Sequence, residues 1–422
     1  MTADVPRSID TVVIGGGHAG TIMSWHLQRA GRDHVVLERR ATLGGGWQDS
    51  WDTFTLVSPN WTSGLPGFPY EGDDPDGFMP RDEMVARIAR YPAAIGAPVH
   101  TSTAVARLGP GGPGGGGRSG RRRFHLETSQ GPIDADSVVL AVGAFHRPRI
   151  PAVASGLAPR LAQLHAQDYR RADALPPGGV LIVGTGQTGV QMAEELHADG
   201  REVWLSTGRC GRAPRRYRGL DFFWWFRQLA ERGESHGTPL PSVDSLPDPK
   251  ARFVCNPHLS GRNGGHDTNL RRMAMDGIHL AGRLTDADGE RVTFAPDLAD
   301  NLRWGDDFFD VRYRDLVERF AALDGIEAGP DDRIPVEYEP AGIESLDLAG
   351  AGISTVLWTT GFQPDYGWLD FPILDETGIP RQVEGRTDVP GLFTIGQLWQ
   401  RNMASANLLG VHLDAEAVAA SW

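Results

Sequence analysis

Two glycine-rich segments constrain the fold of this 422-residue chain more than any other feature of its sequence. Each follows a short apolar run and opens an amphipathic stretch with the spacing Gly-x-Gly-x-x-Gly. In this pattern the first glycine allows a tight strand-to-helix turn, the second lets the backbone approach a pyrophosphate, and the third lets the helix pack on the strand. The two copies, each closed by a fourth glycine, are Gly15, Gly17, Gly20 and Gly31, then Gly184, Gly186, Gly189 and Gly200. They predict two units that each bind a dinucleotide at a helix N-terminus.

Apolar runs predict the elements around these turns. Residues 9–14 and 35–38 are expected to form strands on either side of the first helix, which gives a βαβ start. Similar buried strands are expected at 137–142 and 353–358. The predicted fold class is therefore α/β, with two Rossmann-like dinucleotide-binding domains of the three-layer ββα/βαβ type.

Glycines and prolines mark the expected domain boundaries. One buried strand ends at Gly143 and the other is followed by Gly361, and proline-rich junctions near both suit a crossing between domains. The chain is expected to leave the first domain near Gly143 and to return near Gly361. We expect a discontinuous first domain at 1–147 and 356–422, an inserted second domain at 148–355, and a flexible Gly-rich loop at 109–120.

The end of the second strand in each unit predicts which nucleotide binds there. In the first unit this strand ends in Glu38, whose carboxylate accepts hydrogen bonds from a ribose diol and repels a 2′-phosphate. The first site therefore fits the adenosine part of FAD, or NAD. In the second unit the acid is missing, and Ser206 and Arg209 stand at the strand end. Hydroxyl and guanidinium groups suit a 2′-phosphate, so NADP(H) fits the second site better.

Composition argues against several classes of partner. The formal net charge of −13 argues against a nucleic-acid or anionic-membrane partner. No apolar run approaches the ~20 residues of a membrane span, and no basic-then-apolar leader is present. Only Cys210 and Cys255 occur, which gives no disulfide framework, no C-x-x-C pair and no metal-spaced cluster. We expect a cytoplasmic protein without a metal site, and a homodimer as the default assembly.

Several motifs along nearly the whole chain resemble those of the class B flavin-containing monooxygenases. The resemblance rests on the segments 15–20, 44–47, 184–189, 359–365 and 396–400, and small bacterial members share a stretch like 208–219. It implies FAD in the first domain and NADPH in the inserted one. It also implies a cycle in which NADPH reduces FAD, the flavin forms a C4a-(hydro)peroxide with O2, and one oxygen atom passes to a small molecule.

The resemblance leaves the substrate open. N-oxygenation of an amine or amino-acid-like metabolite is the preferred interpretation, ahead of S-oxygenation and Baeyer–Villiger oxidation. A non-catalytic FAD- and NADP-sensing protein would use the same fold. A thiol-disulfide reductase with tandem nucleotide domains would need two redox cysteines close in sequence, which this chain lacks.

One signature of the family is degenerate in this chain. Only His165 and Tyr169 remain of the pattern Phe-x-Gly-x-x-x-His-x-x-x-aromatic, because Pro159 and Leu161 replace its phenylalanine and glycine. This weakens a Baeyer–Villiger assignment, and purely structural hydrogen bonds from the two residues are an equal alternative. The aromatic residues at 217–226 are expected in a core, or as a roof that shields a reactive flavin from water.

The candidate site residues follow from the motifs and from the resemblance. The resemblance implies that Asn60 is a catalytic residue near the reactive edge of the flavin, and that Gly46 and Trp47 lie beside FAD. As a bare sequence feature, however, the Ser-Pro-Asn that ends at Asn60 is only a turn. The other cofactor-binding candidates are Gly15, Gly17, His18, Ala19, Gly20, Glu38, Gly143, Gly184, Gly186, Gln187, Thr188, Gly189, Ser206, Arg209, Thr360, Gly361 and Gln397.

Overall fold

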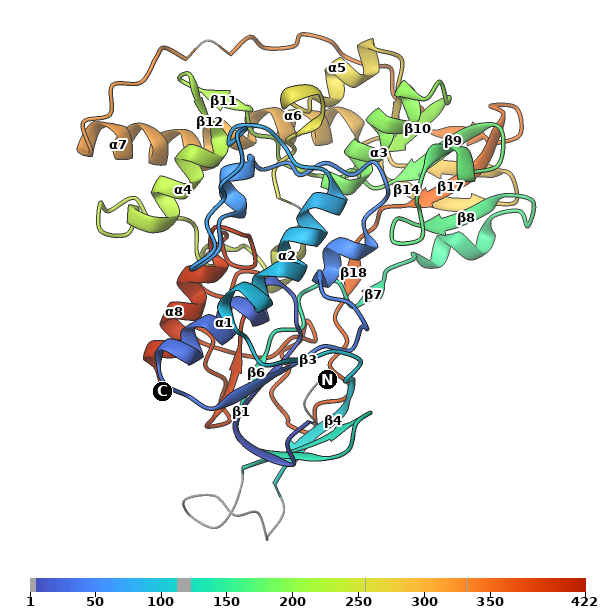
Figure 1. The fold of residues 1–422 in the computed structure, drawn as a ribbon. Coiled ribbons are helices and arrows are strands. Elements are labelled where there is room, and N and C mark those ends of the chain that lie inside the picture. The colour runs from blue at the N-terminus through green and yellow to red at the C-terminus, as the bar shows by residue number, and fades with distance from the viewer. Residues whose placement is uncertain (1–4, 112–122, 255, 332) are drawn as a thin grey trace.

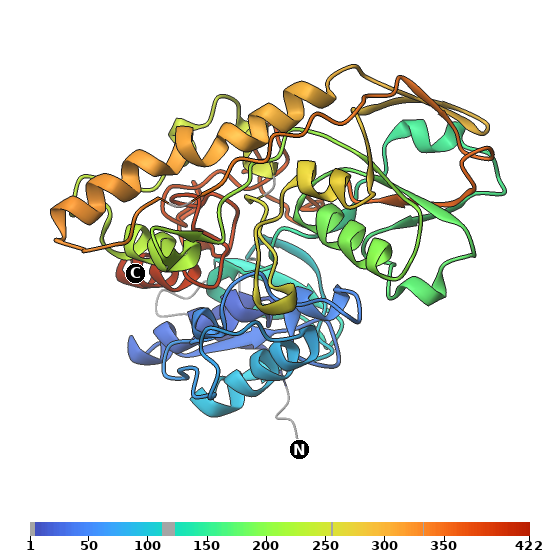
Figure 2. The ribbon, with the colours of Figure 1, turned by 90° about the horizontal axis from the view of Figure 1, so that it is seen from above.

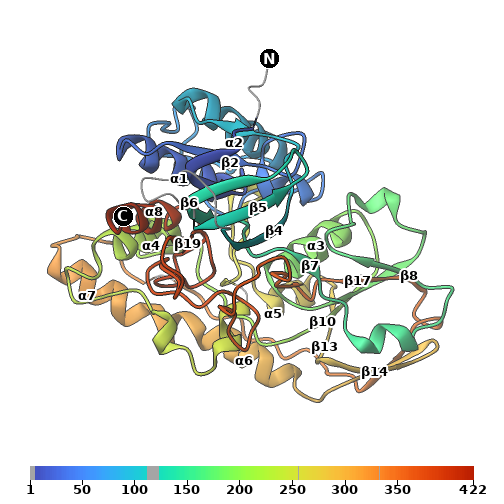
Figure 3. The ribbon, with the colours of Figure 1, turned by 90° about the horizontal axis from the view of Figure 1, so that it is seen from below.

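The protein consists of two sheets flanked by helices and a third, mostly helical lobe (Figure 1). From below, the first sheet, the second sheet and the helical lobe are seen as three distinct parts of the molecule (Figure 3). The computed structural model describes residues 5–111, 123–254, 256–331 and 333–422.

The first sheet has seven strands and carries the first glycine turn. Its strands are β1 (Ser8–Ile14), β2 (His34–Leu37), β3 (Val99–His100), β4 (Val105–Pro110), β5 (Phe124–Thr128), β6 (Ile133–Leu140) and β19 (Leu392–Thr394). The order is β3-β2-β1-β6-β5-β4, and β19 also pairs with β6. Strands β3, β2, β1, β6 and β19 are paired in parallel, whereas β4 and β5 form an antiparallel edge. Because β19 comes from the C-terminal part, the chain returns to this sheet after a long excursion.

Three helices cover one face of the first sheet: α1 (His18–Arg29), α2 (Arg81–Ile95) and α8 (Val411–Ala420). Their apolar side chains form one buried cluster with Val13, Val36 and Val139 of the central strands. The expected Gly-rich loop at 109–120 overlaps the end of β4, which extends to Pro110. From residue 112 onward, that loop lies outside the described residues.

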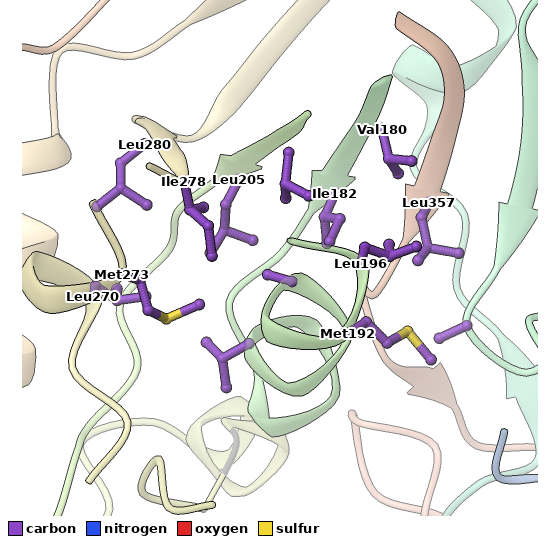
Figure 4. Packing of buried hydrophobic residues seen from close by; sticks show 14 of the residues in the cluster. Val180, Ile182, Met192, Leu196, Leu205, Leu270, Met273, Ile278, Leu280 and Leu357 are labelled. Atoms are coloured by element: carbon purple, nitrogen blue, oxygen red, sulfur yellow. The ribbon is translucent and has the colours of Figure 1, made fainter. Parts of the chain in front are cut away.

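The second sheet has five strands, all parallel, and carries the second glycine turn. Its strands are β8 (Ala162–His165), β9 (Gly179–Val183), β10 (Val203–Ser206), β13 (His279–Ala281) and β17 (Ile353–Trp358), in the order β13-β10-β9-β17-β8. Helices α3 (Gln187–Ala198) and α5 (Leu270–Met275) pack on one face. Figure 4 shows this packing, with Ile182 and Leu357 on the strands close to Met192 and Leu196 on α3.

The two crossings between the sheets lie side by side. They contain β7 (Arg147–Pro148) and β18 (Phe362–Gln363), which pair antiparallel, and the Arg149 N–H donates to the Gly361 carbonyl at 2.9 Å. The expected boundary between residues 355 and 356 falls inside β17, a strand of the second sheet. We therefore propose that the return crossing lies after β17, near Gly361.

The helical lobe consists of β11 (Arg216–Tyr217), β12 (Leu220–Asp221), α4 (Phe222–Arg232), α6 (Leu298–Phe309), the π-helical turn η8 (Asp310–Arg314) and α7 (Asp315–Leu323). From above, α6, η8 and α7 form one long helical run across the molecule (Figure 2). Most of the aromatic residues at 217–226 are buried between these helices and Met403 of the C-terminal part, so they form a core. The roof over a flavin is therefore not their main role.

The remaining short elements connect these parts. A small antiparallel sheet contains β14 (Leu284–Asp288), β15 (Arg291–Phe294) and β16 (Ser345–Asp347). The 3-10 turns are η1 (Gly45–Asp49), η2 (Asn60–Ser63), η3 (Ala152–Gly156), η4 (Ala172–Ala174), η5 (Val243–Ser245), η6 (Pro249–Phe253) and η7 (Arg262–Gly264).

Candidate functional site

The first glycine turn leaves no room for side chains at two of its glycines. Gly15 has a φ of +112°, and a Cβ atom there would lie 2.3 Å from the Ala141 carbonyl oxygen. A Cβ atom on Gly20 would lie 1.9 Å from the Gly15 carbonyl oxygen. Gly17 precedes α1 and no side chain caps the helix, so its first N–H groups remain available. Such a helix start fits the pyrophosphate of a dinucleotide.

The Glu38 carboxylate lies at this turn. It is buried, its Oε2 accepts a hydrogen bond from the Gly16 N–H at 2.9 Å, and its Oε1 accepts one from the Arg40 N–H at 2.8 Å. These bonds fix the carboxylate beside the glycine turn, and each oxygen keeps a further lone pair. A ribose diol fits these remaining positions.

Two buried polar atoms beside the turn have no partner within the described part of the chain. They are Nε2 of His18 and Oε1 of Gln397. Burial lowers the pKa of His18 to about 4, so its ring is neutral at pH 7. An unsatisfied buried polar atom costs about 1–3 kcal/mol, so both atoms favour a polar ligand here. Together with Glu38, they fit the nucleotide part of FAD.

The other predicted residues of the first domain gather around the same turn. A Cβ atom on Gly45 would lie 3.0 Å from the Gly17 Cα, which brings the segment containing Gly46 and Trp47 to the turn. Trp47 is half-buried and packs beside Phe54, with ring centroids 6.1 Å apart, in the cluster of the first sheet. The Gly396 segment approaches the start of α1, where a Cβ atom would lie 2.9 Å from Ala19 Cβ. Gly143 has a φ of +74° and faces open space.

The Asn60 side chain is held by its own loop. Its Nδ2 donates to the Asp74 carbonyl at 2.9 Å, and its Oδ1 accepts from the Met79 N–H at 2.6 Å. The side chain is buried in η2 and joins η2 to Asp74 and Met79 of the same loop. These contacts give Asn60 a structural role in shaping the loop, and its catalytic role stays a prediction.

The second glycine turn repeats the backbone of the first. Gly184 has a φ of +111°, and a Cβ atom on Gly189 would lie 2.1 Å from the Gly184 carbonyl oxygen. Gly186 precedes α3, which also has no side-chain cap and begins with Gln187 and Thr188. The Gln187 amide is held by Leu259, whose carbonyl accepts from Nε2 at 2.5 Å and whose N–H donates to Oε1 at 3.1 Å.

The strand end of the second unit differs from the prediction in one respect. The Ser206 hydroxyl is buried, donates to the Gly282 carbonyl at 3.0 Å and accepts from the Leu284 N–H at 2.9 Å. These bonds use the hydroxyl to hold the chain after β13, so it is not available to bind a 2′-phosphate. Arg209 is exposed just beyond the strand. The predicted 2′-phosphate contact therefore depends on Arg209.

The degenerate signature residues make structural contacts around the crossings. His165 Nε2 lies 3.0 Å from the Gly361 carbonyl oxygen, and the Thr360 hydroxyl donates to the Arg149 carbonyl. The Tyr169 hydroxyl donates to Glu195 Oε1 at 2.8 Å. Their hydrogen bonds thus agree with the structural alternative for His165 and Tyr169.

Glu195 is a functional candidate that the sequence reasoning missed. This buried carboxylate on α3 also accepts from Trp51 Nε1 at 2.7 Å and from the Thr53 hydroxyl, both in the first domain. Glu195 therefore links the helix of the second glycine turn to the first domain. An acidic residue on the buried face of the helix after the second glycine turn was the available signal.

A cavity of about 230 Å³ lies between the loop after Asn60 and the start of the helical lobe. Its lining combines aromatic, basic and acidic side chains, which the sequence placed far apart. The residues that line it are Pro59, Trp61, Asp76, Phe78, Arg215, Arg216, Gly219, Leu220, Asp221, Trp224 and Gly264.

Three further findings concern the cysteines, possible metal ligands and possible membrane spans. Cys210 is disulfide-bonded, whereas the sequence predicted no disulfide framework, and Cys255 lies outside the described residues. In the described ranges, no three His, Cys, Asp or Glu residues are grouped as metal ligands. Every helix of those ranges is too short or too polar to span a bilayer.

The sequence is similar to known flavoprotein oxidoreductases. A family model described as pyridine nucleotide-disulphide oxidoreductase matches residues 12–218, which include both glycine turns. An uncharacterized CzcO-like oxidoreductase of Geobacillus kaustophilus is 27% identical over 412 residues, which cover 97% of this chain and 96% of that protein.

Solved structures share the fold. A flavin-containing monooxygenase from Stenotrophomonas maltophilia has a TM-score of 0.60 at 21% identity, covering 99% of this chain and 98% of its own. S-allyl-L-cysteine S-oxygenase from Allium sativum has a TM-score of 0.58 at 14% identity, covering 98% and 76%. OTEMO, solved with FAD and NADP, has a TM-score of 0.52 at 16% identity, covering 98% and 85%.

The duplicated glycine turns, the buried carboxylate at the first and the similarities along the chain agree with one another. The family model and the full-length relatives identify the protein as an oxidoreductase, and its fold is that of an enzyme solved with FAD and NADP. The chain is therefore similar to the class B flavin monooxygenases and to related pyridine nucleotide-dependent oxidoreductases.

Proposed function

We propose that this protein uses NADPH and O2 to oxygenate a small molecule, preferably at the nitrogen of an amine or amino-acid-like metabolite. The observation that carries the proposal is the pair of matching glycine turns whose strand ends differ in charge. Glu38 stands at the first and Arg209 at the second. Bound FAD would supply the redox and oxygen chemistry, and the protein contributes binding, orientation and exclusion of water.

In the first domain, Glu38 would hold a ribose of FAD by accepting hydrogen bonds from its hydroxyls. The N–H groups after Gly17 would bind the pyrophosphate. His18 Nε2 and Gln397 Oε1, buried without partners in the described residues, would pair with polar groups of the same nucleotide. Asn60 would keep the loop 60–79 in place over the site.

In the second domain, the helix start after Gly186 would bind the pyrophosphate of NADPH. Arg209 would bind the 2′-phosphate, since it is the exposed base nearest the end of β10. Glu195 would hold the second domain against the first through its hydrogen bonds from Trp51 and Thr53.

The test begins with the visible spectrum of the purified protein, followed during addition of NADPH in air. A yellow protein is expected, with NADPH oxidation that rises when a primary amine or amino acid is added. Mass spectrometry after reaction in ¹⁸O2 is expected to find one labelled oxygen on nitrogen. NADPH oxidation that yields only hydrogen peroxide would identify an oxidase, and bound cofactors without turnover would identify a sensor.

S-oxygenation is the second candidate. It is favoured by the similarity over 98% of this chain to an enzyme that oxygenates S-allyl-L-cysteine. A thioether amino acid, run beside the amine in the same ¹⁸O2 experiment, separates the two. Label on sulfur alone would replace the nitrogen assignment, and label inserted beside a carbonyl would indicate Baeyer–Villiger oxidation.

A homodimer is proposed as the working assembly, on the general preference of soluble enzymes for two-fold symmetry. Light scattering during size-exclusion chromatography is expected to give twice the 45.8 kDa mass of the chain. A single-chain mass would reject the dimer. The cytoplasmic location stays a prediction.

A further inference from the structure

The cavity beside Asn60 has an aromatic wall. Trp61 and Phe78 contribute from the loop of the first domain, and Trp224 contributes from α4 of the helical lobe. All three rings are only partly buried, unlike the neighbouring Trp225, which is core. Partly buried rings around a hollow are available to pack on a flat apolar ligand.

A buried arginine lies in the same cavity. Arg215 is only 5% exposed, donates from NH1 to the Val57 carbonyl at 2.7 Å and pairs from NH2 with Asp221 at 2.8 Å. Its Nε is buried and has no partner in the described part of the protein. A buried N–H group of a guanidinium without an acceptor points to an anionic or carbonyl oxygen of a ligand.

Two opposite charges complete the lining. Arg216 and Asp76 both line the cavity and are both exposed. Arg216 comes from β11, and Asp76 comes from the loop 60–79. Because Asp221 already neutralises Arg215, Arg216 supplies the positive charge that a bound carboxylate requires. Asp76 can face an ammonium group.

The volume limits the ligand. About 230 Å³ is below the ~300–1,000 Å³ that drug-sized ligands occupy. A dinucleotide does not fit, whereas a molecule the size of one amino acid does. The volume therefore favours a substrate-sized occupant over the whole coenzyme.

We propose that this cavity binds the carboxylate and the ring of a small aromatic amino-acid-like substrate, with Arg216 and Arg215 Nε on the carboxylate and Trp61, Phe78 and Trp224 around the ring. This inference rests on the proposed function, because it names the substrate class of that reaction. Pro59 and Trp61, which line the cavity, are the immediate neighbours of Asn60, so the ligand would lie beside the predicted reaction site.

The test measures binding to the oxidised, FAD-loaded protein without NADPH, by isothermal titration calorimetry. Three probes separate the features: L-phenylalanine, 3-phenylpropanoate without the amine, and 2-phenylethylamine without the carboxylate. We expect the two carboxylates to bind at least about tenfold more tightly than the amine, from the lost charged hydrogen bonds. In the variant Arg216→Gln that preference should fall to about twofold or less.

The matched control is Arg303→Gln, which removes an exposed arginine of α6 outside the cavity. It should keep both the preference and the affinity. A second variant, Trp224→Leu, should weaken all three probes alike, because it removes a ring and no charge. Circular dichroism and the flavin spectrum show whether each variant is folded.

Three outcomes would overturn the inference: equal binding of 2-phenylethylamine, an unchanged preference in Arg216→Gln, or no binding of any probe. A loss of NADPH affinity in Arg216→Gln, with probe binding intact, would assign this arginine to the coenzyme instead. The proposed function fails separately: probe binding without any oxygenated product leaves the site standing and rejects the monooxygenase. If 2-phenylethylamine binds as tightly as the carboxylates and is oxygenated, the monooxygenase function stands and the carboxylate site is rejected.

Discussion

The two glycine turns have nearly the same backbone and different strand ends. Their first glycines have φ values of +112° and +111°, and in both the third glycine meets the carbonyl of the first at about the same distance. At the strand ends, Glu38 presents a carboxylate to its turn, whereas the Ser206 hydroxyl faces away into the structure. From this comparison we propose that the turn provides phosphate binding, and that the residues beyond it select the nucleotide.

The largest effect is expected from the third glycines. In Gly20→Ala the new Cβ atom meets the Gly15 carbonyl, and in Gly189→Ala it meets that of Gly184. Overpacking of this kind costs about 1–3 kcal/mol, or about 10–100-fold in affinity. Gly20→Ala should weaken FAD binding to the apoprotein, and Gly189→Ala should raise the KM for NADPH with FAD retained.

The control for these variants is Gly342→Ala, because the nearest atom to its new Cβ lies 4.0 Å away. It should change neither value. If Gly189→Ala lost FAD and kept its NADPH affinity, the assignment of the two turns would be reversed.

The next effect concerns acid. Burial lowers the pKa of His18 to about 4, and the matching position of the second turn is Gln187, which does not titrate. In the unfolded chain His18 takes up a proton below pH 6.5, whereas in the folded protein it does so only near pH 4. The contribution of His18 to the free energy of unfolding is therefore complete above pH 6.5 and is lost as the pH falls toward 4. Because the ring is partly exposed, we expect a loss of about 2 kcal/mol.

Thermal unfolding of wild type and His18→Gln from pH 7 to pH 4 measures this effect. The variant should lose less stability over that range than wild type. If the stability of the two proteins fell equally with pH, the acid sensitivity would come from groups other than His18.

An effect of similar size is expected at Glu38. Glu38→Gln keeps the shape but weakens the acceptor, and a charged hydrogen bond contributes about 1.5–3 kcal/mol. FAD affinity should fall about tenfold or more, measured by the fluorescence of FAD titrated with apoprotein. The KM for NADPH should stay within about twofold, since the two turns act on different nucleotides.

The smallest effect separates Arg209 from Ser206. Arg209→Gln should lower the preference for NADPH over NADH about tenfold, the scale of one lost charged hydrogen bond. Ser206→Ala should lower thermal stability by about 1 kcal/mol and leave the coenzyme ratio unchanged, because its hydroxyl holds Gly282 and Leu284. Steady-state kinetics with both coenzymes checks the pair, and a ratio that shifts only in Ser206→Ala would contradict the structural role.

The sequence predicted those features that depend on local backbone chemistry. Both glycine turns, the strand at 353–358 and the acid at Glu38 follow from spacing over a few residues, and the structure contains each of them. Contacts between segments distant in the chain could not be predicted from the sequence. The Ser206 hydroxyl is used by residues more than 70 positions away, and Glu195 joins Trp51 across the domains.

The cavity illustrates the same limit. Trp61, Arg215 and Trp224 meet only because the helical lobe folds back on the loop of the first domain. Arg215 lies only six residues after Arg209, but its burial and its ion pair with Asp221 could not be read from that proximity.

The paired crossings have a consequence for the architecture of the protein. Arg147–Pro148 and Phe362–Gln363 run alongside each other. The roughly two hundred residues between them are therefore connected to the first domain by one pair of adjacent strands. The inserted residues could be excised and replaced by a short bridge between the two strands. The first sheet would keep its strand pairings, because all of its strands lie outside the insert. Such an excision would also remove Glu195, so Trp51 and Thr53 would lose the carboxylate that accepts their hydrogen bonds.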